Sequence, residues 1–151
     1  MMPEDIDGED FEITRDDLRQ WYSDTVIDHV FNPKNLKEMP DANGFGEVDG
    51  SCGDTMRVWV KVKDGVIADI SFTTNGCGAT IASGSMVTEL AKGKSFSEAM
   101  ALNQHDVLDA LGGLPEDNEH CARLAVSTLK AALNDYIALQ KEPWKKAYRE
   151  H

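Results

Sequence analysis

The sequence predicts an α+β fold in which a small antiparallel three-stranded sheet packs against about five helices. Two apolar runs with period-two alternation flank an Asp-Gly pair near the middle of the chain, as expected of a β-hairpin. After this hairpin the apolar residues recur at helical spacing. Strands followed by helices within 151 residues indicate a single α+β domain.

The first predicted helix covers residues 14–31. Thr14 followed by Asp17 resembles a helix start, and Asn32-Pro33 ends the segment because the residue before proline disfavours the helical conformation. Four apolar residues at helical spacing lie between these signals: Leu18, Tyr22, Val26 and Val30.

The sheet is predicted from an edge strand at residues 45–48 and a hairpin at residues 56–63 and 66–72. Asp64-Gly65 favours a type I′ turn, because glycine adopts positive φ at no steric cost. The apolar side chains of the hairpin share one parity, and we expect them to face the helices. They are Met56, Val58, Val60, Val62, Val66, Ala68, Ile70 and Phe72.

Four more helices are predicted after the hairpin. The first covers residues 79–91, and the spacing of Ser95 and Glu98 predicts a capping box at the start of a short second helix. The third covers residues 104–111, and the last covers residues 118–140.

We expect one domain over residues 14–141, between a mobile acidic tail at 1–13 and a C-terminal tail at 142–151. The first ten residues are acidic, unlike the basic start of a signal peptide. All apolar runs are far shorter than the roughly 20 residues that span a bilayer. These observations predict a cytoplasmic protein.

The charge balance excludes two classes of partner. Lys and Arg number 15 and Asp and Glu 27, so the net charge is -12. Nucleic-acid binding and polybasic membrane binding both require clustered Lys and Arg, and we therefore expect neither. The three cysteines are an odd number, which makes a disulfide framework a poor explanation. Reduced thiols with a chemical role, or inert core cysteines, remain.

Three short segments each combine a cysteine with glycine or with a second donor side chain. They are Ser51-Cys52-Gly53-Asp54, Gly76-Cys77-Gly78 and His120-Cys121. The first two flank the hairpin, and an antiparallel hairpin returns the chain to its starting end, so their loops should be neighbours. Cys77 and Cys121 also lie at predicted helix starts, where the helix dipole favours a thiolate.

Three thiols with a carboxylate at Asp54 and an imidazole at His120 make a candidate soft-metal site. Structural zinc sites usually carry close cysteine pairs, which this chain lacks. A permanent electron-transfer cluster uses four cysteines, whereas here the fourth ligand is the oxygen or nitrogen donor. Such a site should release a cluster readily, which suits a carrier.

Two other functions are consistent with the same residues. A zinc-held sulfur acceptor would use Cys52, Asp54, Cys77 and Cys121 as a tetrahedral site. A cysteine hydrolase would use Cys121 with His120, but neighbours on one helix are expected to point in different directions, which disfavours this function.

At these residues the sequence resembles the IscU/NifU family of iron–sulfur cluster assembly scaffolds, in its stand-alone NifU N-terminal form. The matching segments are SCGDTMRVWVKV, GCGATIASGSMVTELAKGKS and HCARLAVSTLKAALNDY. FNPKNL also looks like the exit of the family's N-terminal helix. The similarity extends from about Asp24 to Tyr136 and implies the IscU/NifU-like α+β fold.

The resemblance implies a scaffold and not an enzyme. A cysteine desulfurase would supply persulfide sulfur, iron would enter the same site, and a ferredoxin-type donor would supply electrons. A transient [2Fe-2S] cluster would form and pass to apo-proteins or carriers, homodimers would couple two such clusters, and zinc would also fit the site. Cys52, Cys77 and Cys121 match the family's cysteines, with Cys121 as persulfide acceptor. Asp54 matches the acid that keeps the cluster labile, and His120 the alternative ligand.

One segment departs from the family pattern. The bacterial IscU form carries Leu-Pro-Pro-Val-Lys before its His-Cys pair, and Hsp70 and J-protein chaperones recognise that motif. Here the segment is Leu114-Pro115-Glu116-Asp117-Asn118-Glu119. The resemblance therefore implies Hsp70 and J-protein chaperones as partners, although this chain lacks the motif that they recognise.

Overall fold

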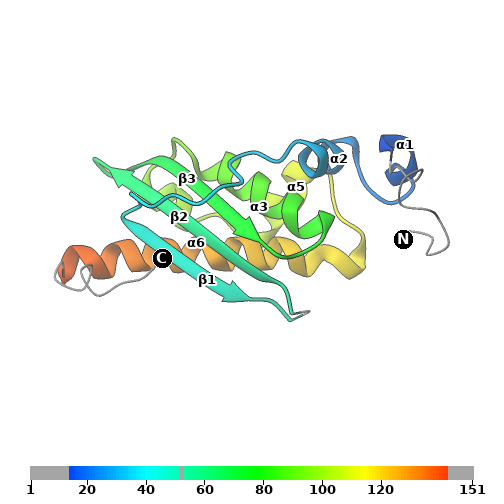
Figure 1. Ribbon diagram of the computed structural model, residues 1–151. Coiled ribbons are helices and arrows are strands. Elements are labelled where there is room, and N and C mark those ends of the chain that lie inside the picture. Colours follow the sequence, from blue (N-terminus) through cyan, green and yellow to red (C-terminus); the bar gives the residue numbers. More distant parts are fainter. Residues whose placement is uncertain (1–13, 52, 143–151) are drawn as a thin grey trace.

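The computed structural model describes residues 14–51 and 53–142. Its three strands form an antiparallel sheet in the order β1-β2-β3, with helices packed on one face (Figure 1). The α+β prediction is confirmed. The predicted tail at 1–13, and residues 143–151 of the C-terminal tail predicted at 142–151, lie outside the described residues. The elements are α1 Arg15–Leu18, α2 Asp24–Phe31, β1 Gly44–Asp49, β2 Thr55–Lys63, β3 Val66–Thr74, α3 Gly78–Ala91, α4 Phe96–Met100, α5 Gln104–Leu111, the 3₁₀ turn η1 Glu116–Asn118, and α6 Glu119–Lys141.

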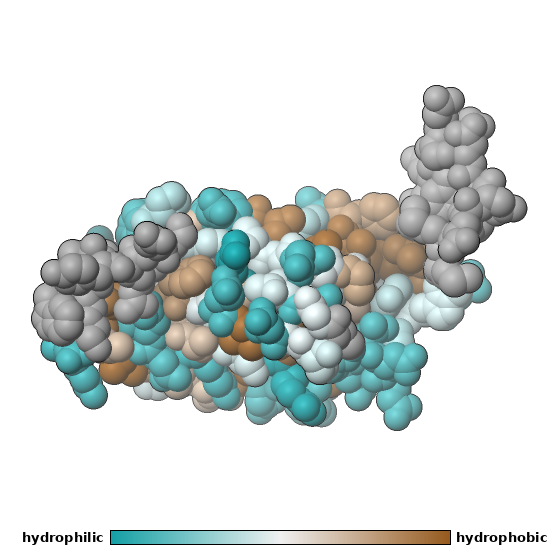
Figure 2. Space-filling view, turned by 60° about the horizontal axis from the view of Figure 1, so that its bottom comes forward, coloured by the Kyte–Doolittle hydropathy of each residue, from teal (hydrophilic) through white to brown (hydrophobic). Residues whose placement is uncertain are grey.

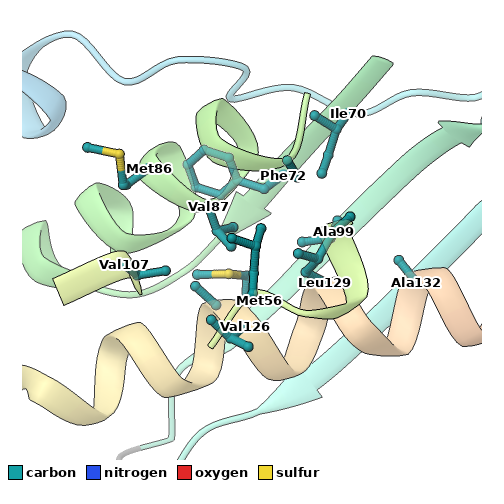
Figure 3. Close-up of a cluster of buried hydrophobic side chains, with 14 of the residues drawn as sticks. Met56, Ile70, Phe72, Met86, Val87, Ala99, Val107, Val126, Leu129 and Ala132 are labelled. Carbon is teal, nitrogen blue, oxygen red and sulfur yellow. The ribbon is translucent and has the colours of Figure 1, made fainter. Parts of the chain in front are cut away.

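The main hydrophobic core lies between the sheet and helices α3, α5 and α6 (Figure 3). Met56 from β2, Phe72 from β3 and Leu129 from α6 are all 0% exposed. Each such side chain contributes about 1.5–3 kcal/mol by leaving water. Burial of this one face fixes the sheet against the helices that carry two of the three cysteines.

The outer face of the sheet carries a smaller apolar cluster. Trp59 is 3% exposed and packs with Met39, Ala42 and Phe45. The Phe45 and Trp59 rings lie 5.3 Å apart, centroid to centroid. The loop before β1 therefore covers part of the face that the helices leave open.

The hairpin turn agrees with the prediction, but the second strand departs from the predicted alternation. Asp64 and Gly65 have φ values of 54° and 76°, as a type I′ turn requires. The register of β2 against β3 then shifts by one residue at Ala68. As a result Ile67 is buried, while Val66 and Ala68 are exposed. The prediction that Val66 and Ala68 face the core is wrong, because one extra residue inverts the parity of the strand end.

The predicted single helix over residues 14–31 is also wrong, because the structure divides it into α1 and α2. Ser23 caps α2 by accepting a hydrogen bond from the Val26 amide at 3.1 Å. The same hydroxyl donates to the carbonyl of Leu111, at the end of α5. This tertiary contact holds the break in place, so the described residues contain six α-helices.

Helix α6 lies directly against the backbone of β1. A Cβ added at Gly46 would lie 2.6 Å from the Ala132 nitrogen and 2.7 Å from the Thr128 oxygen. A Cβ at Gly44 would lie 2.6 Å from the Ala132 oxygen. Because Cβ atoms do not approach backbone this closely, glycine at both positions lets α6 settle on the strand. The first turn of α6, which carries Cys121, takes its position from this contact.

The exit of α2 is held against α3 by buried polar groups. Nδ1 of His29 lies 2.6 Å from the Ser85 hydroxyl, which also accepts from the Lys34 amide at 2.8 Å. Asn35 donates to the Thr88 hydroxyl at 3.0 Å. Burial lowers the pKa of His29, although nearby carboxylates partly oppose the effect. The helix exit predicted at Asn32-Pro33 is therefore stabilised by contacts to α3.

Figure 2 shows one face of the molecule, where hydrophilic side chains are distributed over the surface with apolar areas between them. Among the described residues, no helix combines the length and the apolar character needed to cross a membrane.

Candidate functional site

Three segments that are distant in the sequence meet at one end of the sheet: the β1–β2 loop, the β3–α3 connection and the start of α6 (Figure 1). The pairing of Met56 with Thr74 places the start of β2 beside the end of β3, as the hairpin predicts. The Thr55 amide also donates to the side-chain oxygen of Asn75 at 2.8 Å. These contacts bring Asp54 close to the segment that leads into Cys77.

A tight turn returns the β1–β2 loop to the sheet. The Gly53 amide donates to the Gly50 carbonyl at 3.1 Å, and the Gly50 amide donates to the Asp54 carbonyl at 2.6 Å. Gly53 has φ 86°, a conformation that favours glycine. Cys52 lies outside the described residues, so its participation in the site stays a prediction.

Asp54 and Cys121 are joined through the hydroxyl of Thr80. That hydroxyl donates to Oδ2 of Asp54 at 2.8 Å and lies 3.4 Å from Sγ of Cys121. Thr80 is 0% exposed and Cys121 is 2% exposed. The structure therefore brings the predicted oxygen donor and one predicted sulfur donor to the same point.

His120 lies beside the same sulfur. Its Nε2 is 3.8 Å from Sγ of Cys121, and the imidazole is half-buried. The expectation that these neighbours point in different directions is wrong, because a side chain in the first turn has no full helical turn before it to restrict its rotamer. Hydrogen bonds to sulfur are longer than those between oxygen and nitrogen, so this separation is a weak hydrogen-bond contact. His120 and Cys121 therefore place a nitrogen donor next to a sulfur donor.

Cys77 is the N-cap of α3, and its thiol is exposed and free of disulfide. The start of a 14-residue helix carries partial positive charge and favours an anionic ligand. Burial raises the pKa of the Tyr22 phenol, and the nearby Cys77 and Cys121 add to the rise. Tyr22 thus lies near both sulfurs, whereas its position in an apolar stripe predicted only core packing.

Among residues 14–51 and 53–142, no three His, Cys, Asp or Glu side chains are grouped tightly enough to hold a metal ion. Cys52 lies outside these residues. The ligand set of Cys52, Asp54, Cys77, His120 and Cys121 therefore stays a prediction. Sequence reasoning missed Thr80. The clue in the sequence was a hydroxyl side chain on the buried side of a helix that begins at a candidate cysteine.

A family model described as the NifU-like N terminal domain matches residues 21–143. The iron-sulfur cluster assembly scaffold protein IscU 1 of Archaeoglobus fulgidus is 49% identical over 117 residues, which are 77% of this chain and 76% of that protein. The scaffold protein IscU of Escherichia coli K12 is 47% identical over 120 residues, which are 76% of this chain and 93% of that protein.

Two solved structures resemble the fold. The N-terminal NifU-like protein from Brucella abortus has a TM-score of 0.62 at 17% identity and covers 77% of this chain and 94% of its own. The putative SUF-system scaffold from Fervidobacterium islandicum AW-1 has a TM-score of 0.60 at 25% identity and covers 74% of this chain and 96% of its own. The sheet and helices described above are therefore a shared architecture.

Proposed function

The chain belongs to the NifU-like N-terminal domain family, and from this premise we propose that it is a scaffold for iron–sulfur cluster assembly and not an enzyme. Curated relatives with 47–49% identity are named as such scaffolds. The observation that carries the proposal is the contact of Asp54 and Cys121 through Thr80, at the end of the sheet where Cys77 begins α3.

Sulfur enters as a persulfide from a cysteine desulfurase. The thiolate of Cys121 attacks the terminal sulfur of the donor persulfide, the donor S–S bond breaks, and the donor cysteine leaves as a thiolate. The terminal sulfur is then part of a persulfide on Cys121. Because Cys121 is 2% exposed, this step includes a local opening around the start of α6.

Formation of the cluster also requires iron and electrons. Reduction of each persulfide sulfur to sulfide takes two electrons, for which we propose a ferredoxin-type donor and ferrous iron. The product is a [2Fe-2S] cluster held by Cys52, Cys77 and Cys121, with Asp54 or His120 in the remaining position. Zinc is a competing ion for these donors, because thiolate and imidazole also suit zinc.

Asp54 makes the cargo exchangeable. A carboxylate is a harder ligand than a thiolate and binds iron–sulfur clusters less well, so the bond to Asp54 is the first to exchange. Apo-proteins or carriers, in some cases assisted by Hsp70 and J-protein chaperones, then take the cluster. Two copies of the chain, each with a [2Fe-2S] cluster, would combine them in a homodimer.

Anaerobic reconstitution tests the proposal. The reduced protein is mixed with a cysteine desulfurase, cysteine, an electron donor and ferrous iron, and iron and acid-labile sulfide are measured after desalting. We expect iron and sulfide to be retained in equal amounts with visible absorption. Absence of both from the wild-type protein would contradict the scaffold function.

Substitution of Asp54 tests its role separately. Asp54→Ala should lengthen the lifetime of the bound cluster by about tenfold, the equivalent of one interaction of about 1.4 kcal/mol. Asp49→Ala is the matched control, because Asp49 ends β1 at the same end of the sheet but accepts a hydrogen bond from the Thr55 hydroxyl instead of from Thr80. Failure of Asp54→Ala to form any cluster would contradict the proposed labilising role.

A further inference from the structure

We propose that Thr80 is a positioning residue of this site: its hydroxyl holds the carboxylate of Asp54 beside the sulfur of Cys121, and this hold determines how quickly a bound cluster leaves. The inference rests on the proposed scaffold function and identifies a residue that controls its release step.

Thr80 differs from Ser83 and Thr128, two other buried hydroxyl residues of the helices that flank the site. Ser83 donates to the Ala79 carbonyl at 2.8 Å, and Thr128 donates to the Leu124 carbonyl at 2.7 Å. Both bond back to their own helix, which is the usual arrangement for a hydroxyl within a helix. The Thr80 hydroxyl instead makes its contacts with two other segments of the chain. The Thr80 side chain is therefore directed toward the candidate site instead of toward the backbone of its own helix.

The geometry leaves the hydroxyl in a bridging position. Thr80 has one hydroxyl proton, and that proton is directed to Oδ2 of Asp54. The oxygen then faces Sγ of Cys121 at 3.4 Å. Because Thr80 is 0% exposed and lies in the first turn of α3, the bridge is fixed to a rigid element. Asp54, which lies in a loop, gains a fixed side-chain position from it.

The absence of a side chain at position 76 leaves room for this bridge. A Cβ at Gly76 would lie 2.8 Å from Oδ2 of Asp54 and 2.7 Å from Cβ of Thr80. Any larger residue would separate the carboxylate from the hydroxyl. The Gly-Cys-Gly segment therefore supplies both the Cys77 thiol and the space in which Asp54 meets Thr80.

A hydroxyl that holds one carboxylate oxygen keeps Asp54 at the edge of the site as a single-oxygen donor. Without the hydroxyl, the carboxylate turns toward water and spends less time near the cluster. Removal of the hydroxyl should therefore change the cluster lifetime in the same direction as removal of the carboxylate. The two substitutions should also be non-additive, because they interrupt one interaction.

The test compares rates of cluster loss to a chelator after anaerobic reconstitution, followed by visible circular dichroism. Thr80→Val keeps the shape and removes the hydroxyl, and should slow the loss by about three- to tenfold, the range of one ordinary hydrogen bond. Thr80→Ser keeps the hydroxyl and should lose the cluster at the wild-type rate. Thr80→Ala provides a second hydroxyl-free variant if Thr80→Val does not fold.

Thr128→Val is the matched control, because it removes a buried hydroxyl that bonds only within α6. It should leave the rate unchanged. In the Asp54→Ala protein, Thr80→Val should add less than about a twofold further change. A merely structural role for Thr80 would give independent effects of the two substitutions and no rescue by Thr80→Ser.

The outcomes separate the two proposals. If the wild type assembles a cluster but Thr80→Val and Thr80→Ala lose it at the wild-type rate, the positioning role is wrong and the scaffold function stands. The same conclusion follows if Thr80→Val and Asp54→Ala act additively. If the wild type assembles no cluster, the scaffold function is wrong and the role of Thr80 falls with it.

Discussion

The close approach of α6 to β1 leads to a quantitative prediction at Gly46. A Cβ there would lie 2.6 Å from the Ala132 nitrogen, 0.8 Å closer than the 3.4 Å at which ordinary contact begins. A second clash, at 2.7 Å, involves the Thr128 oxygen. Both partners are backbone atoms in the middle of a 23-residue helix, so neither can rotate away. Relief requires that α6 shift relative to the sheet.

Gly46→Ala should therefore lower the free energy of unfolding by about 1–3 kcal/mol, the range for overpacked cores. Gly78→Ala is the matched control. The new Cβ at position 78 would lie 3.4 Å from a methyl group of Val30, which is the short end of ordinary van der Waals contact. With a compatible backbone, glycine to alanine is neutral or stabilises by up to about 1 kcal/mol, because the unfolded chain loses freedom.

Urea unfolding of the apo proteins, followed by circular dichroism, measures both changes under the two-state approximation. A shift of the midpoint without a change of slope would indicate an effect on the folded state. If Gly46→Ala and Gly78→Ala are equally stable, the reasoning about helix–strand contact is wrong.

Two further predictions concern a buried histidine and the cysteines. Burial lowers the pKa of His29 in the folded protein, so the unfolded state binds the proton more readily. The free energy of unfolding should fall as pH decreases through and below about 6.5, the unfolded value, and less steeply in His29→Asn. An equal slope in urea titrations of both proteins would contradict this assignment. Cys77 is exposed and Cys121 is 2% exposed, so limiting iodoacetamide should alkylate Cys77 before Cys121 in the apo protein. Peptide mass mapping reads out the order, and faster labelling of Cys121 would show that the buried position does not describe the apo protein in solution.

Local signals predicted much of the fold. The capping box at Ser95 and Glu98, the Asp64-Gly65 turn and the bounds of α5 all agree with the structure. Each depends on residues a few positions apart, whose hydrogen bonds or backbone preferences are readable from the sequence. The segments that carry Cys77 and His120-Cys121 were likewise identified from their own residues.

The errors in the predicted fold came from contacts between distant residues. The break before α2 depends on Ser23 and the end of α5, and the burial of Ile67 depends on a bulge at Ala68. Neither feature changes the local apolar spacing from which the elements were predicted. The bridge from Asp54 through Thr80 was missed for the same reason, since a threonine in a helix usually bonds within that helix.

The sequence by itself determined most of the strands and helices, which residues carry donor chemistry and to which family the chain is similar, because these follow from neighbouring residues. Only the tertiary structure decided how the donors meet: α6 rests on the glycines of β1, Cys121 is buried while Cys77 is exposed, and one hydroxyl joins Asp54 to a sulfur from another helix. Those relations depend on packing across the sheet, and close packing couples residues that no local pattern connects.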